Sequence, residues 1–138
     1  REEFVKMLVL ALNIHDNTLK TYFSDTDNDA WYNSYLASAV KYELISGIGN
    51  NMFGVGEKMT REDMAVVLNR SLKYPTDEDT EKYSDDAVIS AYAKDAVSAM
   101  KQAGIMRGVE NNCFAPKANV TRAMAAKVIY EMRKLVKK

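Results

Sequence analysis

The sequence predicts an all-α fold, a pseudo-threefold helical bundle whose loops are short, irregular and β-like. Two observations lead to this fold class. Similar apolar-periodic stretches open at Arg1, Arg61 and Arg122, which lie 60 and 61 residues apart. Loop residues recur at the same spacing, as the pair Ser24-Asp25 and Ser84-Asp85 shows. A period that carries both helix faces and loop residues indicates one supersecondary unit used several times.

We expect the 138 residues to form a single domain, since this length buries one core. Two complete repeats span 22–74 and 82–136. Residues 1–13 correspond to the second helix of a truncated first repeat. A chain that opens at the second residue of a helix motif is expected to be a fragment, with a capping Thr or Ser before its first residue.

The second helix of each repeat is predicted at 1–13, 60–73 and 121–136. Each has one apolar face, and packing the three faces together would bury all of them. Thr60 is a good N-cap, and Asp63 at position N3 makes an approximate capping box. The last repeat keeps the cap as Thr121 but has Met124 in place of the acidic residue, so that box is half lost.

The first helix of each complete repeat is predicted at 30–43 and 90–103, where apolar residues recur at i, i+3 and i+4. Tight loops rich in Gly and Asn follow at 47–51 and 107–112, because these residues tolerate positive φ. A few extended residues around 52–53 and 113–114 are expected to pair briefly. The acidic run 77–81 after Pro75 is expected to be an exposed linker.

Composition excludes several functions. Nineteen basic residues balance nineteen acidic ones, so bulk electrostatics gives no attraction to nucleic acid. No apolar run approaches the ~20 residues of a membrane span. His15 and Cys113 are single residues of their kinds, so a disulfide, a multi-histidine zinc site and a Ser-His-Asp triad cannot form. Cys113 is expected to be a small buried apolar residue.

No catalytic set, cofactor site or metal centre is predicted. The run Asp25–Asp29 resembles the start of a calcium loop, but Ala30 replaces the sixth-position Gly and Leu36 the twelfth-position Glu, so an EF-hand is rejected. A weaker calcium site stays open as an alternative.

An Arg at the first helical position adds a fork of donors to the N–H groups of a helix start, which favours an anion. Three such starts would give up to three anion-attracting notches. The alternative is a local salt bridge of Arg61 or Arg122 to Asp25, Asp85 or Glu62. Trp31, close to the predicted loops, is either a surface on which a sugar ring stacks or a core residue.

The chain resembles the S-layer homology (SLH) family over nearly its whole length. The family pattern runs from an aromatic-x-Asp opening through a Trp-bearing helix, a Gly-containing loop and a Phe-x-Pro step to Thr-Arg-Ala-Glu. The middle repeat carries it as Phe23-Ser24-Asp25, Trp31, Leu44-Ile45-Ser46-Gly47, Phe53 and Thr60-Arg61-Glu62-Asp63. The last repeat carries it as Tyr83-Ser84-Asp85, Gly104-Ile105-Met106-Arg107-Gly108, Phe114-Ala115-Pro116 and Thr121-Arg122-Ala123.

This resemblance implies a non-catalytic secreted module that anchors a surface protein or exoenzyme to the bacterial cell wall or S-layer. The implied partner is secondary cell-wall polysaccharide, often pyruvylated, bound in Arg-bearing grooves between repeats. Other surface-layer proteins are further possible partners. The residues implied in ligand binding are the anion partners Arg61, Arg122 and Arg1, the stacking surface Trp31, the hydroxyl acceptors Asp25 and Asp85, and the close-approach backbone of Gly47 and Gly108.

Three positions depart from the family pattern: Ala91 stands in place of Trp, Met124 in place of Glu, and Val55 in place of Pro. At least one notch is therefore expected to be weak or purely structural. The alternative function is a protein-interaction or assembly module of the S-layer or a cell-surface complex, without glycan binding. An enzyme acting on wall glycan is disfavoured because no catalytic set is visible.

Overall fold

The computed structural model describes residues 1–75 and 80–136. The regular structure of these residues is helical, with isolated bridges but no strand, which confirms the all-α prediction. The α-helices are α1 (Glu2–Ala11), α2 (Asn33–Lys41), α3 (Arg61–Leu72), α4 (Lys94–Gln102) and α5 (Arg122–Val136). The short 3₁₀ turns are η1 (Asp86–Val88), η2 (Ala91–Ala93) and η3 (Glu110–Asn112).

The chain forms two compact units, unit 1 (Arg1–Lys58) and unit 2 (Met59–Lys138). The boundary between them falls inside the predicted repeat 22–74. Each unit therefore combines the last helix of one sequence repeat with the first helix and loops of the next. The repeat limits and the threefold grouping of the second helices, which would involve both units, stay predictions.

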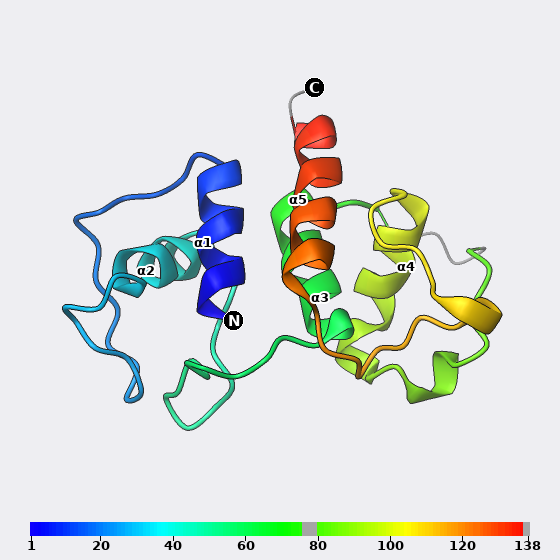
Figure 1. Ribbon diagram of the computed structural model, residues 1–138, viewed down its shortest axis with the longest axis horizontal. Coiled ribbons are helices and arrows are strands. Elements are labelled where there is room, and N and C mark those ends of the chain that lie inside the picture. The colour runs from blue at the N-terminus through cyan, green and yellow to red at the C-terminus, as the bar shows by residue number, and fades with distance from the viewer. Residues whose placement is uncertain (76–79, 137–138) are drawn as a thin grey trace. The chain divides into compact units, whose positions relative to one another are not determined.

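In unit 1, α1 packs against α2 (Figure 1). The amphipathic pattern of α1 explains the contact, since its buried residues recur at helical spacing. The buried apolar residues of unit 1 are Phe4, Val5, Leu8, Val9, Leu36, Ala37, Ala39, Leu44, Ile45 and Phe53. Asn33 and Ser38 of α2 are also buried, and their polar atoms hold the preceding segment against the helix.

In unit 2, α3 packs against both α4 and α5 (Figure 1). The buried apolar residues of these helices are Met64, Ala65, Val67, Leu68, Ala96, Val97, Ala99, Met100, Ala125, Val128, Ile129 and Met132. Buried apolar residues outside these helices add to the core, and they are Met59, Tyr83, Ile89, Ala93, Ile105, Met106 and Phe114. The aromatic residue of the repeated loop, Phe53 or Phe114, is thus fully buried in each unit.

The helix ends follow the predicted caps where a side chain forms the cap. The Thr60 hydroxyl accepts from the Asp63 amide at 3.3 Å, and the Thr121 hydroxyl accepts from the Met124 amide at 3.1 Å. The sulfur of Met124 lies 3.5 Å from the Thr121 amide, in the place where the acidic partner of a capping box would accept. The half-lost box therefore keeps a weak acceptor.

The first helices are shorter than predicted. The stretch 30–43 yields α2 over Asn33–Lys41, because the Asn33 side chain bonds outward to the segment before it. The stretch 90–103 divides into η2 and α4. Positive φ at Glu43 (60°) and Gly104 (74°) follows the two helix ends.

The predicted loop pairing is present as isolated bridges, Gly49 with Met52 and Val109 with Cys113. Cys113 is half-buried rather than buried as predicted, and its Sγ lies 3.2 Å from the Ser84 hydroxyl. Of the acidic linker predicted at 77–81, residues 77–79 lie outside the described residues, and Glu81 is exposed.

Candidate functional site

Asp25 and Asp85 fix the loop that contains the buried phenylalanine of each unit. The Asp25 carboxylate accepts from the amides of Phe53, Gly54 and Val55 at 2.8, 2.8 and 2.9 Å. Burial raises the pKa of Asp25, but these hydrogen bonds together outweigh it and lower the pKa below its usual value. The two oxygens predicted to accept sugar hydroxyls are thus engaged by backbone.

Asp85 performs the same task in unit 2 with one hydrogen bond fewer. Its carboxylate accepts from the amides of Phe114 and Ala115, both at 2.9 Å. The next residue is Pro116, which has no amide hydrogen to donate. The aromatic-x-Asp motif therefore builds the loop in both units.

Arg61 reaches from the start of α3 to this loop in unit 2. Its Nε donates to the Phe114 carbonyl and its Nη2 to the Arg107 carbonyl, both at 2.8 Å. The guanidinium carbon lies 4.8 Å from the centroid of the Phe114 ring, and only 6% of the residue is exposed. The donors of Arg61 therefore bind carbonyl oxygens and not the carboxylates of Asp25, Asp85 or Glu62, so the salt-bridge alternative is wrong for Arg61. For Arg122 the same alternative stays a prediction.

Arg1 and Arg122 differ from Arg61 in what surrounds them. The guanidinium carbon of Arg1 lies 5.3 Å from the centroid of the Phe53 ring, which repeats the cation–π contact of unit 2. Arg122 at the start of α5 is exposed. Three equivalent arginines therefore occupy two environments, loop-packed and solvent-facing.

Glu62, the residue after Arg61, is the centre of a hydrogen-bonded cluster in unit 2. Its side chain is 3% exposed and forms an ion pair with the Lys117 ammonium at 2.7 Å. It also accepts from the Ser90 amide at 2.9 Å and the Ser90 hydroxyl at 2.8 Å. Burial raises the pKa of Glu62, but Lys117 and Ser90 outweigh it and lower the pKa. We call Glu62, Ser90, Tyr92 and Lys117 the Glu62 cluster.

Tyr92 completes this cluster at the surface. Its hydroxyl donates to Asp63 at 2.6 Å and lies 3.2 Å from Glu62, while 65% of the residue is exposed. Burial of the hydroxyl and the neighbouring Asp63 carboxylate raise the pKa of Tyr92. The buried Glu62 carboxylate thus contacts two groups that reach the surface, the phenol of Tyr92 and the ammonium of Lys117.

Unit 1 presents aromatic rings at the corresponding place. Trp31 is 54% exposed, so its alternative role as a core residue is wrong. Its ring centroid lies 5.7 Å from that of Tyr32 and 6.4 Å from that of Tyr35. The Lys6 ammonium lies 5.4 Å from the Trp31 centroid and 5.5 Å from the Tyr35 centroid. We call Lys6, Trp31 and Tyr35 the aromatic platform.

His15 supports the aromatic platform from the segment after α1. Its ring stacks on Tyr35 with centroids 4.1 Å apart and planes 11° apart. Its Nε2 lies 2.9 Å from the Ser34 hydroxyl. The stacked His15 ring therefore covers one face of the Tyr35 ring and fixes its position relative to Lys6.

Gly47 and Gly108 approach the chain's own loop. A Cβ on Gly47, whose φ is +88°, would lie 2.6 Å from the Met52 carbonyl oxygen. A Cβ on Gly108 would lie 2.7 Å from the Tyr83 ring. Each glycine thus lies close to the backbone or a side chain of its own unit. The close approach of these glycines to a ligand stays a prediction.

The predicted site residues form two groups, one around the buried phenylalanine of each unit. Asp25 and Gly47 lie around one buried phenylalanine, as do Asp85, Arg61 and Gly108 around the other. Sequence reasoning missed Lys6, Tyr35 and Lys117, and it treated Glu62 only as a salt-bridge partner. The acidic residue after the repeated Arg, present as Glu2 and Glu62, was the available signal.

Among the described residues, no group of three or more His, Cys, Asp or Glu is placed to hold a metal ion. None of the helices described has the length and apolar character needed to cross a bilayer. The Asp27 carboxylate of the calcium-like run accepts from the Asp29 amide at 2.9 Å, an ordinary turn contact.

Comparison with known proteins identifies the family. Residues 22–65 and 82–126 match the S-layer homology domain. The chain therefore belongs to the S-layer homology family. It is 38% identical over 135 residues to an amylopullulanase of Thermoanaerobacterium thermosulfurigenes and 36% identical over 135 residues to exoglucanase XynX of Acetivibrio thermocellus. It is 27% identical over 113 residues to S-layer protein sap of Bacillus anthracis.

These alignments cover 94%, 94% and 82% of the chain but only 7%, 12% and 14% of the relatives. The chain thus corresponds to a small part of each relative. S-layer homology domains occur in S-layer proteins and in cell-surface enzymes, and membership of the family points to anchoring at the cell surface or cell wall.

Proposed function

We propose that this chain is a non-catalytic module that anchors a bacterial surface protein or exoenzyme by binding secondary cell-wall polysaccharide. Family membership supports the surface location, and the shared part of the enzyme relatives is this module rather than their full length. The observation that carries the glycan proposal is the aromatic platform, in which an exposed indole lies beside a lysine ammonium.

The aromatic platform suits a sugar that bears a carboxylate. The apolar face of a sugar ring packs on the exposed part of Trp31, while the Lys6 ammonium is a point charge for an anion. A pyruvate ketal places a carboxylate directly on a sugar, so a pyruvylated polymer matches both features. Tyr35 and His15 keep the Lys6 side of the platform in place.

The Glu62 cluster is the equivalent contact surface of unit 2. Lys117 supplies the ammonium and Tyr92 the ring, while the buried Glu62 carboxylate orients both through hydrogen bonds. The Lys117 ammonium donates to Glu62 and to the Ser90 hydroxyl. Since its side chain is 55% exposed, its third N–H is accessible to a carboxylate.

The predicted ligand residues then divide by role. We assign Arg61, Asp25, Asp85, Gly47 and Gly108 to building the loops that carry the contact surfaces, because their polar atoms or close approaches are used within the units. Arg1 packs on Phe53 in the same manner as Arg61. Exposed Arg122 is the arginine that we retain as a direct anion partner. Contact of Arg1 and Arg61 with the polymer stays a prediction.

The test is sedimentation of the chain with purified cell walls that carry or lack their secondary polymer. Trp31→Ala is expected to weaken binding about fivefold, because aromatic stacking contributes roughly 1 kcal/mol. Tyr22→Ala is the matched control, since Tyr22 is an aromatic residue of unit 1 that is more exposed than Trp31. It is expected to have no effect.

Equal binding to stripped and intact walls would contradict the polymer as partner. Equal binding of the Trp31→Ala and Tyr22→Ala variants would remove the aromatic platform from the mechanism. Because several relatives are S-layer proteins, purified surface-layer subunits form a second arm. Capture of such a subunit without polymer would favour the assembly module instead.

A further inference from the structure

Unit 1 contains a polar pocket to which the proposed function assigns no role. It has a volume of about 410 Å³ and lies where two helices end, because its wall includes the residues that follow α1 and the last residue of α2. This volume falls in the lower range of small-molecule sites. We call it the helix-end pocket, and the polar residues of its wall are Asn13, His15, Asp16, Asn17, Lys41 and Tyr42.

The helix-end pocket holds a carboxylate and an ammonium that do not pair with each other. Asp16 and Lys41 form no ion pair among the described residues. The Thr18 hydroxyl and amide donate to Oδ1 of Asp16 at 2.6 and 2.9 Å, and Oδ2 makes no hydrogen bond with described residues. These hydrogen bonds lower the pKa of Asp16, and the positive charge of Lys41 lowers it further. The pocket therefore contains an ionised carboxylate with one oxygen that is available to a ligand.

The two helix ends add to the negative side of the pocket. The C-terminal end of a helix carries a partial negative charge, because its last carbonyl groups have no partner within the helix. Both α1 and α2 end at this pocket. A cation is therefore favoured beside Asp16, and Lys41 is the group of the pocket that favours an anion.

Asn13 and Asn17 add two side-chain amides to the pocket wall. Both residues are exposed, and neither side chain forms a hydrogen bond among the described residues. Each amide supplies two N–H donors and a carbonyl acceptor. The amides can therefore bind either end of a ligand that carries both charges.

The sequence of unit 2 places different chemistry at the corresponding positions. Lys73 stands in place of Asn13, so an ammonium replaces an amide. Thr76, which lies outside the described residues, stands in place of Asp16, so the carboxylate is missing from the sequence at that position. The combination of charges in the helix-end pocket is therefore a property of unit 1.

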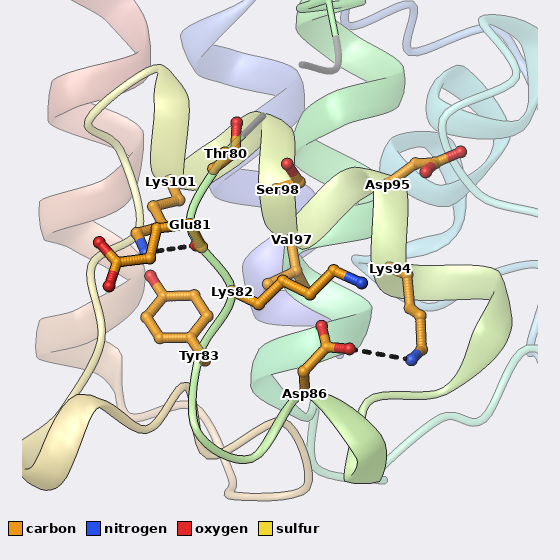
Figure 2. Close-up of a pocket in the computed structure, with 10 residues that line it drawn as sticks. All are labelled: Thr80, Glu81, Lys82, Tyr83, Asp86, Lys94, Asp95, Val97, Ser98 and Lys101. Carbon is orange, nitrogen blue, oxygen red and sulfur yellow. Dashed lines mark hydrogen bonds and ion pairs between the residues drawn. The ribbon is translucent and has the colours of Figure 1, made fainter. Parts of the chain in front are cut away.

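The lysine that both units share is engaged only in unit 2. Lys101 corresponds to Lys41, and its ammonium donates to the Glu81 carbonyl at 2.7 Å, as Figure 2 shows. Lys41 forms no hydrogen bond or ion pair among the described residues, and its ammonium lies 5.9 Å from the centroid of the exposed Tyr42 ring. The donors of Lys41 are thus available to a ligand.

We propose that the helix-end pocket binds a free amino-acid group, that is, an ammonium and a carboxylate on one carbon atom. The ammonium contacts Asp16 beside the helix ends, and the carboxylate contacts Lys41. A free amino acid carries this group, and so does a diamino acid that is joined to a peptide through only one of its two ends. This site goes beyond the anchoring function and does not depend on it.

The experiment is an NMR titration of the ¹⁵N-labelled full chain with three probes. Alanine carries both charges, alaninamide only the ammonium, and N-acetylalanine only the carboxylate. Alanine is expected to shift the amide signals of Asn13–Asn17, Lys41 and Tyr42. Each of the other two probes is expected to bind about fivefold more weakly, because it lacks one exposed charge contact.

Two charge-removing variants assign the ends of the ligand. Asp16→Asn keeps a side-chain oxygen that accepts from Thr18, so the turn is retained, and it is expected to weaken alanine and alaninamide about fivefold but not N-acetylalanine. Lys41→Gln is expected to weaken alanine and N-acetylalanine about fivefold but not alaninamide. Asp29→Asn is the matched control, because Asp29 is an exposed aspartate of unit 1 outside the pocket. It is expected to change each Kd less than twofold.

A fourth probe, a tripeptide that ends in diaminopimelate with one free amino-acid group, separates the two sources. Binding at least about tenfold tighter than that of alanine would assign the pocket to a peptide, and equal binding would assign it to free amino acids. Alaninamide binding equal to that of alanine would overturn the proposal in favour of a simple cation site.

The outcome is independent of wall anchoring. Trp31→Ala is expected to weaken wall sedimentation but to leave the alanine titration unchanged. Shifts confined to residues outside the helix-end pocket, or an unaltered Kd in both Asp16→Asn and Lys41→Gln, would overturn the pocket even if the chain sediments with polymer-bearing walls.

Discussion

Unit 1 carries Trp31 and Tyr35 at positions where unit 2 carries Ala91 and Asp95. The lysine over these rings, Lys6, corresponds to Val66 of unit 2. In exchange, unit 2 has Lys117 where unit 1 has Gly56. Unit 1 therefore holds a lysine ammonium over aromatic rings, and unit 2 holds one on a buried carboxylate.

The frame beneath these surfaces is the same in both units. An aspartate accepts from the loop amides, an arginine guanidinium lies over the loop phenylalanine, and a glycine approaches the aromatic-x-Asp ring. The comparison teaches that the repeated motif residues mainly specify the loops, while the residues between them determine what each unit presents to a ligand. The predictions below test that division.

The largest difference is expected between two equivalent arginines. Arg61→Ala should lower the free energy of unfolding of unit 2 by about 3 kcal/mol, since two carbonyls lose their donors and a buried side chain leaves a cavity. Arg122→Ala should change it by less than about 0.5 kcal/mol because Arg122 is exposed. Urea unfolding followed through NMR signals of unit 2 measures both, and equal losses would contradict the division.

The two aspartates should differ in proportion to their amide partners. Asp25→Asn is expected to cost about 2 kcal/mol and Asp85→Asn less, because Asp25 accepts three backbone hydrogen bonds and Asp85 two. Unfolding of each unit, followed through its own NMR signals, provides the measurement. An equal or larger cost for Asp85→Asn would show that the third hydrogen bond contributes nothing.

The Asp25 contribution should also depend on pH. Its pKa in the folded chain lies below the ordinary value of 3.8, so the carboxylate stabilises the fold above that pH. This stabilisation is lost as the pH falls through the lowered pKa, because the folded state must then take up a proton. The stability difference between the natural chain and Asp25→Asn should therefore be constant at neutral pH and shrink below about pH 3.8.

The second helices were predictable because each combines a capping Thr or an opening Arg-Glu step with an apolar period. The starts of the first helices were not, since they depend on side-chain contacts such as that of Asn33 with Thr21. Asp25 and Arg61 were recognised because they recur in the repeats. The amides that donate to Asp25 and the carbonyls that accept from Arg61, however, lie tens of residues away in the chain. No local pattern gives such pairings.

The Glu62 cluster shows the same limit more strongly. Glu62 and Lys117 are 55 positions apart, and both belong to residue types that are mostly exposed. The exposure of Trp31 was equally beyond local patterning, which fits a half-buried helix face as well as an exposed one. The repeat pattern identified the positions of candidate residues, but the packing of each unit determined which residues they contact.

The last pair of substitutions concerns the residue after the buried phenylalanine. Gly54 has φ +94°, and Ala115 takes the corresponding place with φ 58°. Gly54→Ala should destabilise unit 1 by about 1–2 kcal/mol, because a Cβ is strained at positive φ. Such a Cβ would also lie 3.3 Å from atoms of Arg1, Glu57 and Ile48. Thermal or urea unfolding of unit 1 measures this loss.

Ala115→Gly should change the stability of unit 2 by less than about 1 kcal/mol, in the stabilising direction. Relief of the left-handed strain at this position exceeds the extra chain entropy that glycine brings to the unfolded state. The reciprocal pair thus compares one backbone position in two units that differ in the chemistry of their exposed surfaces. A destabilised Ala115→Gly variant would mean that the Ala115 side chain makes packing contacts that Gly54 lacks, and the loops of the two units would not share one frame at this point.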